Sequence, residues 1–196
     1  MPLLSTRANA SARGYGMFGG VAAGGGTSYE SIATQTVGSG GSTSITFSSI
    51  PSTYKHLQIR ALIKTSNSGA PYAFQIRYNG DTGSNYTYHR LFGGGGGALT
   101  SVATTGATQA SLAYIPASGE TNIFANCIAD ILDYTDTSKN KVHRALGGYD
   151  ANGSGYGTFF SGVWLNTSAI TSITVISESG STMAQYSSIA LYGIKG

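Results

Sequence analysis

The sequence contains one cysteine, Cys127, among its 196 residues. A single cysteine can form neither an intrachain disulfide nor a zinc site built on several thiolates. Cys127 lies within the apolar run NIFANCIADIL, where a thiol usually serves as a small buried hydrophobic group. We therefore expect it to belong to the core and to carry no redox chemistry.

Charged side chains are also scarce. Asp, Glu, Lys and Arg make up 10% of the chain, against about 25% in typical soluble domains. The net charge is only +3, and no stripe of Lys and Arg or RNA-binding signature is present, so we expect no nucleic-acid partner. Serine, threonine, asparagine and glycine replace the charges, and this composition is more common in extracellular and virion β-proteins than in cytosolic enzymes.

Long hydrophobic runs are missing as well. No stretch approaches 18 consecutive apolar residues, so we expect no membrane insertion. The first residues lack the apolar segment of a signal peptide. These features fit a protein made in a host cytoplasm that acts elsewhere, as virion proteins released by lysis do.

What the sequence does contain is a series of short segments that alternate apolar and polar residues. In HLQIRALIKT (56–65), Leu57, Ile59 and Ile63 fall on one face, which is the period of a half-buried strand. YAFQIRY (72–78) repeats the pattern, and no segment shows a helical stripe with caps. Ten to twelve such strands predict an all-β fold, an antiparallel β-sandwich of jelly-roll type over residues 29–196. The other candidate strands are 31–37, 43–47, 85–92, 99–104, 110–115, 121–134, 141–149, 157–166, 172–178 and 187–194.

Turn residues separate these strands. SNSGAP (66–71), NGDTGSN (79–85) and DTSKNK (136–141) are short enough to predict hairpins between neighbouring strands. DANGSG (150–155) is a further turn. The run GGGGG (93–97) lacks the Lys-Ser/Thr and the following helix of a phosphate loop, so it predicts a crossing loop or a close backbone contact.

Residues 1–28 differ from the rest because they are small and glycine-rich and show no sustained period. Such a segment buries too little apolar surface to fold alone. It nevertheless carries apolar and basic anchors, and two interpretations remain open: a flexible terminus, or an extended arm that becomes ordered on a partner subunit. For the second, the predicted assembly residues are Arg7, Arg13, Tyr15, Met17 and Phe18.

The residues that could carry chemistry do not form a recognisable set. His56, His89 and His143 lie in separate strands, without a second ligand at metal-site spacing, and are predicted on polar faces or subunit contacts. Asp130 interrupts an apolar run and is predicted to be a buried, hydrogen-bonded strand residue, whereas Asp81 lies in a turn, where a carboxylate binds backbone N–H groups. No nucleophile, base and orienting group come together in the sequence. We expect no enzyme activity, no metal site and no cofactor.

Aromatic residues beside polar turns, which we expect to be exposed, are the remaining functional signal. Such side chains can stack on sugar rings or fill subunit interfaces, although cross-strand packing is an equal alternative. The predicted host or subunit contacts are Asp81, Asn85, Tyr86, Tyr88, His89, Tyr149 and Tyr156.

Four stretches of the chain are distinctive: LLSTRANASARGYGMFGG (3–20), SIPSTYKHLQIRALIKT (49–65), YNGDTGSNYTYHRLFG (78–93) and ITSITVISESGSTMAQYSSIALYGIKG (170–196). They resemble stretches of small virion proteins of tailed bacteriophages that are described as tail-fibre-like. The resemblance extends to Trp164 in GVWLN and is weakest over 98–150. It implies a virion component, and openings similar to SARGYGMFGG in other phage tail proteins imply an attachment arm. It implies no catalytic residues.

The sequence and the resemblance together predict a structural component of a phage virion, a tail fibre or tail adaptor protein that docks through its arm and contacts the host surface. Its expected partners are other tail or capsid subunits, further copies of itself, with a trimer as the form typical of fibres and spikes, and a host surface glycan. Two alternatives remain open, a capsid decoration protein and a non-catalytic carbohydrate-binding module.

Overall fold

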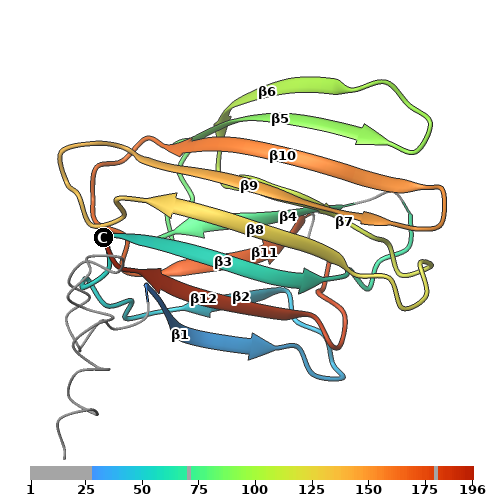
Figure 1. Cartoon of the computed structure of the whole chain (residues 1–196), viewed down its shortest axis with the longest axis horizontal. Helices are drawn as coiled ribbons and strands as arrows, with labels where there is room; N and C mark the ends of the chain where they lie inside the picture. The colour runs from blue at the N-terminus through green and yellow to red at the C-terminus, as the bar shows by residue number, and fades with distance from the viewer. Residues whose placement is uncertain (1–27, 70–71, 179–180) are drawn as a thin grey trace, which may run out of the picture.

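The computed structural model describes residues 28–69, 72–178 and 181–196, and they form two antiparallel sheets packed face to face (Figure 1). The prediction of an all-β antiparallel sandwich is confirmed. The strands are β1 (Tyr29–Thr36), β2 (Ser44–Phe47), β3 (His56–Ile63), β4 (Tyr72–Tyr78), β5 (Tyr86–Gly94), β6 (Thr100–Ala107), β7 (Ala110–Ile115), β8 (Ala125–Leu132), β9 (Lys141–Asp150), β10 (Gly155–Trp164), β11 (Ile173–Ser177) and β12 (Ser188–Ile194).

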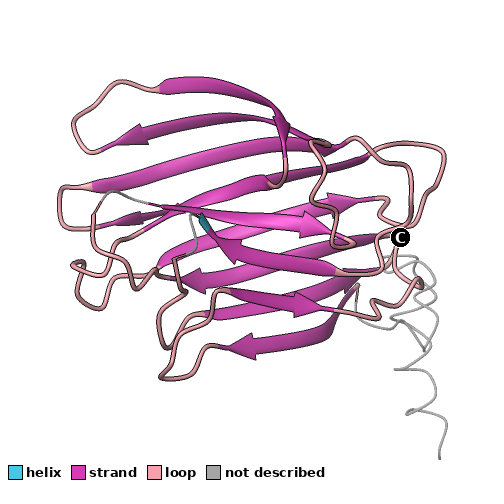
Figure 2. Ribbon diagram, turned by 180° about the vertical axis from the view of Figure 1, so that it is seen from behind, coloured by secondary structure: helices cyan, strands magenta, loops and turns pink. Residues whose placement is uncertain are grey.

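The two sheets differ in size. The larger has eight strands in the order β1-β12-β3-β8-β9-β10-β5-β6, and the smaller has four in the order β2-β11-β4-β7. The chain passes from one sheet to the other at every connection between consecutive strands except β5–β6, β8–β9 and β9–β10, which join neighbours within the larger sheet. The hairpins β5–β6 and β9–β10 widen the larger sheet, and Figure 2 shows the smaller sheet from behind.

The core lies between the sheets and follows the alternation in the sequence. On β3, Leu57, Ile59 and Ile63 are fully buried, whereas Leu62 on the opposite face is exposed. Cys127 on β8 is 1% exposed, and burial raises the pKa of its thiol to about 12. The prediction that this cysteine is a buried core residue is confirmed.

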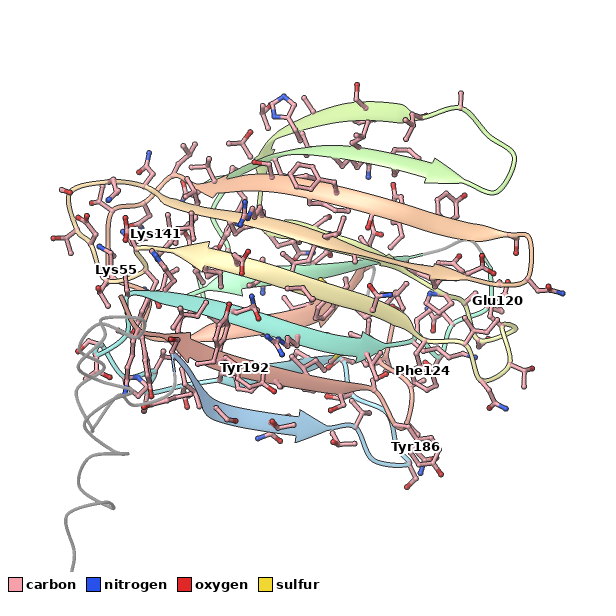
Figure 3. All side chains as sticks on the ribbon, in the orientation of Figure 1. Lys55, Glu120, Phe124, Lys141, Tyr186 and Tyr192 are labelled. Carbon is pink, nitrogen blue, oxygen red and sulfur yellow. The ribbon has the colours of Figure 1, made fainter. Side chains whose placement is uncertain are left out.

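Strand β9 reverses the usual distribution of side chains. Lys141 and His143 point into the sandwich and are 0% and 3% exposed, whereas Val142 and Leu146 point outward. The buried ammonium group of Lys141 donates to the backbone oxygens of Asp136 (2.5 Å), Lys139 (2.9 Å) and Thr167 (2.8 Å). These three bonds satisfy its donors and join the β8–β9 and β10–β11 loops at one end of the sheets (Figure 3). The prediction that His143 lies on a polar face was wrong.

Two of the three predicted hairpins were wrong. The segments 66–71 and 79–85 each join strands of different sheets, and only 136–141 joins two neighbours, β8 and β9. At 79–85, Tyr78 of β4 and Tyr86 of β5 both point into the core, where their rings stack 6.2 Å apart, and Trp164 binds Asp81 between them. The turn 150–155 connects the paired strands β9 and β10.

The glycine run at 93–97 lies where two hairpins meet. Because β5 pairs with β6, the run belongs to a hairpin connection, so the alternative of a crossing loop was wrong. A Cβ atom on Gly95 would overlap the backbone oxygen of Gly153 in the β9–β10 turn. The predicted close backbone contact is confirmed, and it explains why a side chain does not fit at this position.

The predicted arm residues Arg7, Arg13, Tyr15, Met17 and Phe18 lie outside the described residues. In the part of the chain that the structure describes, no helix is long and apolar enough to cross a membrane.

Candidate functional site

The turn at 79–85 holds the predicted contact residue Asp81 in a network of internal hydrogen bonds. Its carboxylate accepts bonds from the indole N–H of Trp164 (2.7 Å), the side-chain amide of Asn85 (2.9 Å) and the backbone N–H of Gly83 (2.8 Å). These bonds lower the pKa of Asp81. The bond from Trp164 has the largest effect, and the bond from Asn85 has the second largest. Both predicted contact residues in this turn, Asp81 and Asn85, therefore stabilise the fold around the buried Trp164.

Asn79 gives the same turn a second anchor. Its backbone has a φ of 49°, and its side-chain oxygen accepts bonds from the backbone N–H groups of Thr171 (2.8 Å) and Ser172 (3.1 Å). Its amide donates to the backbone oxygen of Ala169 at 2.8 Å. The NGD sequence thus fixes the loop between β10 and β11 against the end of β4.

Replacing Asp81 by alanine is expected to lower the free energy of unfolding by about 2 kcal/mol, because the buried N–H of Trp164 would lose its acceptor. Urea titration followed by Trp164 fluorescence measures this change. Thr82→Ala, at an exposed position of the same turn, is the matched control and should shift the free energy by less than about 0.5 kcal/mol. Equal stability of the two variants would show that the Asp81 network contributes nothing.

The expectation that Tyr86 and Tyr88 are exposed was wrong. Tyr86 is 0% and Tyr88 8% exposed, because even-numbered residues at this part of β5 point into the sandwich. The hydroxyl oxygen of Tyr86 accepts a bond from the backbone N–H of Tyr78 at 3.0 Å, and its ring stacks 6.4 Å from Trp164. Tyr88 packs on Phe160 at 6.2 Å. Neither tyrosine is available to a host receptor.

Tyr149 and Tyr156 are half-buried and lie at the other end of the same strands. Their rings are 6.1 Å apart, and Tyr156 also packs against Tyr114 at 5.3 Å. Tyr156 pairs with the last residue of β5, whereas Trp164 pairs with the first. The two predicted contact loops are therefore separated by the length of β5, roughly 30 Å, and do not form one site.

The histidines do not converge either. His89 is exposed on β5, on the outward face of the larger sheet, by which we mean the face turned away from the smaller sheet. His56 accepts a bond from the backbone N–H of Asp133 through Nδ1 (3.0 Å). Burial lowers the pKa of His143 to about 4, so its imidazole is neutral at pH 7. Within the described ranges, no three His, Cys, Asp or Glu residues are placed to hold a metal ion.

The most prominent unassigned feature is a row of apolar side chains across the outward face of the larger sheet. The pairing places Ile128, Leu146, Phe159 and Leu91 directly beside one another on β8, β9, β10 and β5. Their exposed fractions are 48%, 66%, 43% and 42%. We call these four residues the apolar row. The sequence pattern does not predict it, because the row depends on the register of four strands.

Two further rows flank the apolar row. On one side, the polar row contains Asp130, Arg144, Ser161 and His89 in register. Asp130 is partly exposed, so the prediction that it is buried was wrong. The prediction that it is hydrogen-bonded is confirmed, because its carboxylate accepts bonds from the side chains of Gln58 (2.8 Å) and Arg144 (3.2 Å). On the other side, the glycine row contains Gly148, Gly157 and Gly93.

A shallow hollow of about 470 Å³ lies over the glycine row. It is lined by Asn126 and Asp150 and by the backbone of Tyr149 and Tyr156, whose rings lie on the inner side of the sheet. Backbone, amide and carboxylate groups together can bind a polar ring by hydrogen bonds.

Comparisons of this chain with family models, with curated proteins and with solved structures found no match.

Proposed function

We propose that this chain is a structural, non-catalytic component of a bacteriophage particle, and specifically a tail fibre or tail adaptor protein. The observation that carries the proposal is the apolar row. A complete sandwich already buries its core between its own sheets, yet it leaves four adjoining apolar side chains exposed. Contiguous exposed apolar surface of this kind indicates a place where other protein packs.

The chemistry of the turns supports the same role. The segment YNGDTGSNYTYHRLFG, which carries part of the resemblance to phage virion proteins, uses Asn79, Asp81 and Tyr86 to hold loops and core together. The polar groups of these three residues are engaged in building the sandwich. This use fits a scaffold protein better than a catalyst.

The strand order supports the finer assignment of a jelly roll, which we include in the proposal. Without the two hairpins β5–β6 and β9–β10, the sheets read β1-β12-β3-β8 and β2-β11-β4-β7. In this order the first and last strands of the remaining eight are neighbours, as expected for two nested Greek keys. The hairpins then appear as insertions that create most of the apolar row.

Deleting residues 1–28 tests docking through the arm. The truncated protein should keep the β-sheet circular dichroism of the full chain, because all twelve strands lie after residue 28. It should fail to join particles when it is supplied during infection, as measured by mass spectrometry of purified virions. The full-length chain with Tyr15→Ala and Phe18→Ala is the control, because it loses these two aromatic anchors and keeps the rest of the arm. Normal incorporation of the truncated protein into particles would refute docking through the arm.

The exposed apolar row is equally compatible with a capsid decoration protein. The two roles differ in where the protein lies in the particle, on the head or on the tail. Separating heads from tails before mass spectrometry distinguishes the two, since a tail protein is expected in the tail fraction.

The hollow over the glycine row favours a second candidate function, carbohydrate binding, because the polar side chains of Asp150 and Asn126 line it beside open backbone groups. Titration of the chain with host surface polysaccharide tests this candidate. In isothermal titration calorimetry, binding of the polysaccharide that is weakened by Asp150→Ala would support this candidate. The absence of a measurable heat of binding would reject it.

A further inference from the structure

We infer that the outward face of the larger sheet is the surface through which two copies of this chain associate, with the apolar row at the centre of the contact. The inference does not depend on the virion role, because self-association is a property of the isolated chain. Four observations carry it: the continuity of the row, its contrast with the opposite face, its balance of charge and its size.

The continuity of the row distinguishes it from scattered surface residues. Single exposed apolar side chains are normal on any protein, but adjoining ones are not. Leu99, 74% exposed, extends the apolar surface because it leans over Gly93 next to Leu91. Shallow depressions lie on either side of Phe159 and are bordered by Leu146, so the surface offers both projections and recesses.

The outward face of the smaller sheet carries more polar side chains. There, Thr46 and Thr174 are hydrogen-bonded through their hydroxyls at 2.9 Å, and Arg77 donates to the side chain of Gln109 at 2.7 Å. Polar side chains therefore cover one outer face, whereas a row of Ile, Leu and Phe crosses the other. The contrast indicates that the larger sheet is covered in the working assembly.

The charges around the row favour a second copy over a highly charged partner. The outward face carries the bases Arg60 and Arg144 and the acids Asp130 and Asp150, and Arg144 is paired with Asp130 at 3.2 Å. Equal numbers of both signs let two identical faces meet without net repulsion. A face built for a strongly acidic or basic partner would carry charge of one sign.

The dimensions of the face also suit a dimer. Four strands about 4.8 Å apart and four rows of outward residues about 6.8 Å apart project to roughly 500 Å². The standard specific interface buries ~800 Å² per partner, so a face of this size suits a dimer of weak to moderate affinity. In an isologous contact, Leu146 at the centre of the row meets either its own counterpart or Phe159 of the second copy.

Sedimentation velocity of the full chain between about 1 µM and 1 mM tests the inference over the range of weak to moderate affinities. Wild-type protein should shift from monomer to dimer as its concentration rises. Leu146→Lys should raise the dissociation constant of the dimer at least tenfold. Leu165→Lys, at a 52% exposed position outside the row, is the matched control and should leave it unchanged. Phe159→Lys repeats the test, and circular dichroism confirms that each variant is folded.

Cross-linking locates the contact. A bis-maleimide whose span matches the ~10 Å between packed sheets should join copies of Leu146→Cys, or Leu146→Cys to Phe159→Cys, but not copies of Leu165→Cys. The native Cys127 should not interfere, because it is buried and its thiol has a raised pKa. A chain that remains monomeric to 1 mM, or a dimer that Leu146→Lys and Phe159→Lys both leave intact, would overturn the inference. The first result would assign the row to a different subunit.

Discussion

Replacing Lys141 by alanine should lower the free energy of unfolding by about 4 kcal/mol. The substitution removes a fully buried stem and leaves a cavity. It also deprives three backbone oxygens, those of Asp136, Lys139 and Thr167, of a charged donor. Hydrogen bonds to charged groups contribute about 1.5–3 kcal/mol each, and water can replace part of them at a loop.

The measurement is urea unfolding of both proteins at pH 7. Lys55→Ala serves as the control, because the Lys55 side chain is 56% exposed and pairs with Asp133 only at the surface. Exposed pairs contribute about 0–1 kcal/mol, so Lys55→Ala should be close to wild type. If Lys141→Ala lost no more stability than Lys55→Ala, the role of Lys141 in joining the two loops would have to be abandoned.

The second large effect is a loss of stability in mild acid. The pKa of His143 is about 4 in the folded protein, against about 6.5 in an unfolded chain. Because the folded value is depressed, the neutral imidazole contributes its full stability above pH 6.5, and that contribution falls as the pH drops toward 4. The difference in pKa corresponds to about 3 kcal/mol.

Urea unfolding at pH 7.5 and at pH 4.5 measures this dependence. His143→Gln, which cannot titrate in this range, should be destabilised at pH 7.5 but should lose much less stability on acidification than the wild type. The stability that the Asp133 carboxylate contributes is lost mainly below about pH 4, since Lys139 and Lys55 hold its pKa at about 2. Equal pH dependence in the wild type and His143→Gln would show that His143 is not the responsible group.

The sequence predicts the strands well because alternation and burial coincide in most of them. In β3 and β4, the residues expected to face inward, such as Ile59 and Phe74, are fully buried. The joining of the strands was less predictable, since a seven-residue turn can close a hairpin or cross between sheets. At 79–85 the choice depends on Trp164, which lies 83 residues from Asp81 in the chain and binds it.

The candidate surface could not be predicted from local patterns for a different reason. In β9 the apolar residues Val142 and Leu146 point outward and the polar residues Lys141 and His143 point inward, so hydrophobicity alone assigns the faces the wrong way round. Lys141 is tolerated inside because its donors are satisfied. The imidazole of His143 is neutral and packs edge-on against the ring of Tyr78, with the ring centroids 5.9 Å apart. The reversed alternation in KVHRAL was the one signal in the sequence that could have indicated an exposed apolar face.

The central claim is that this chain is a structural part of a phage particle. Quantitative mass spectrometry of virions purified by density gradient and washed with high salt tests it most directly. The claim predicts that the chain remains with the particles in a fixed copy number relative to the other structural subunits. Recovery of the chain only in the soluble lysate, with none in washed particles, would contradict it.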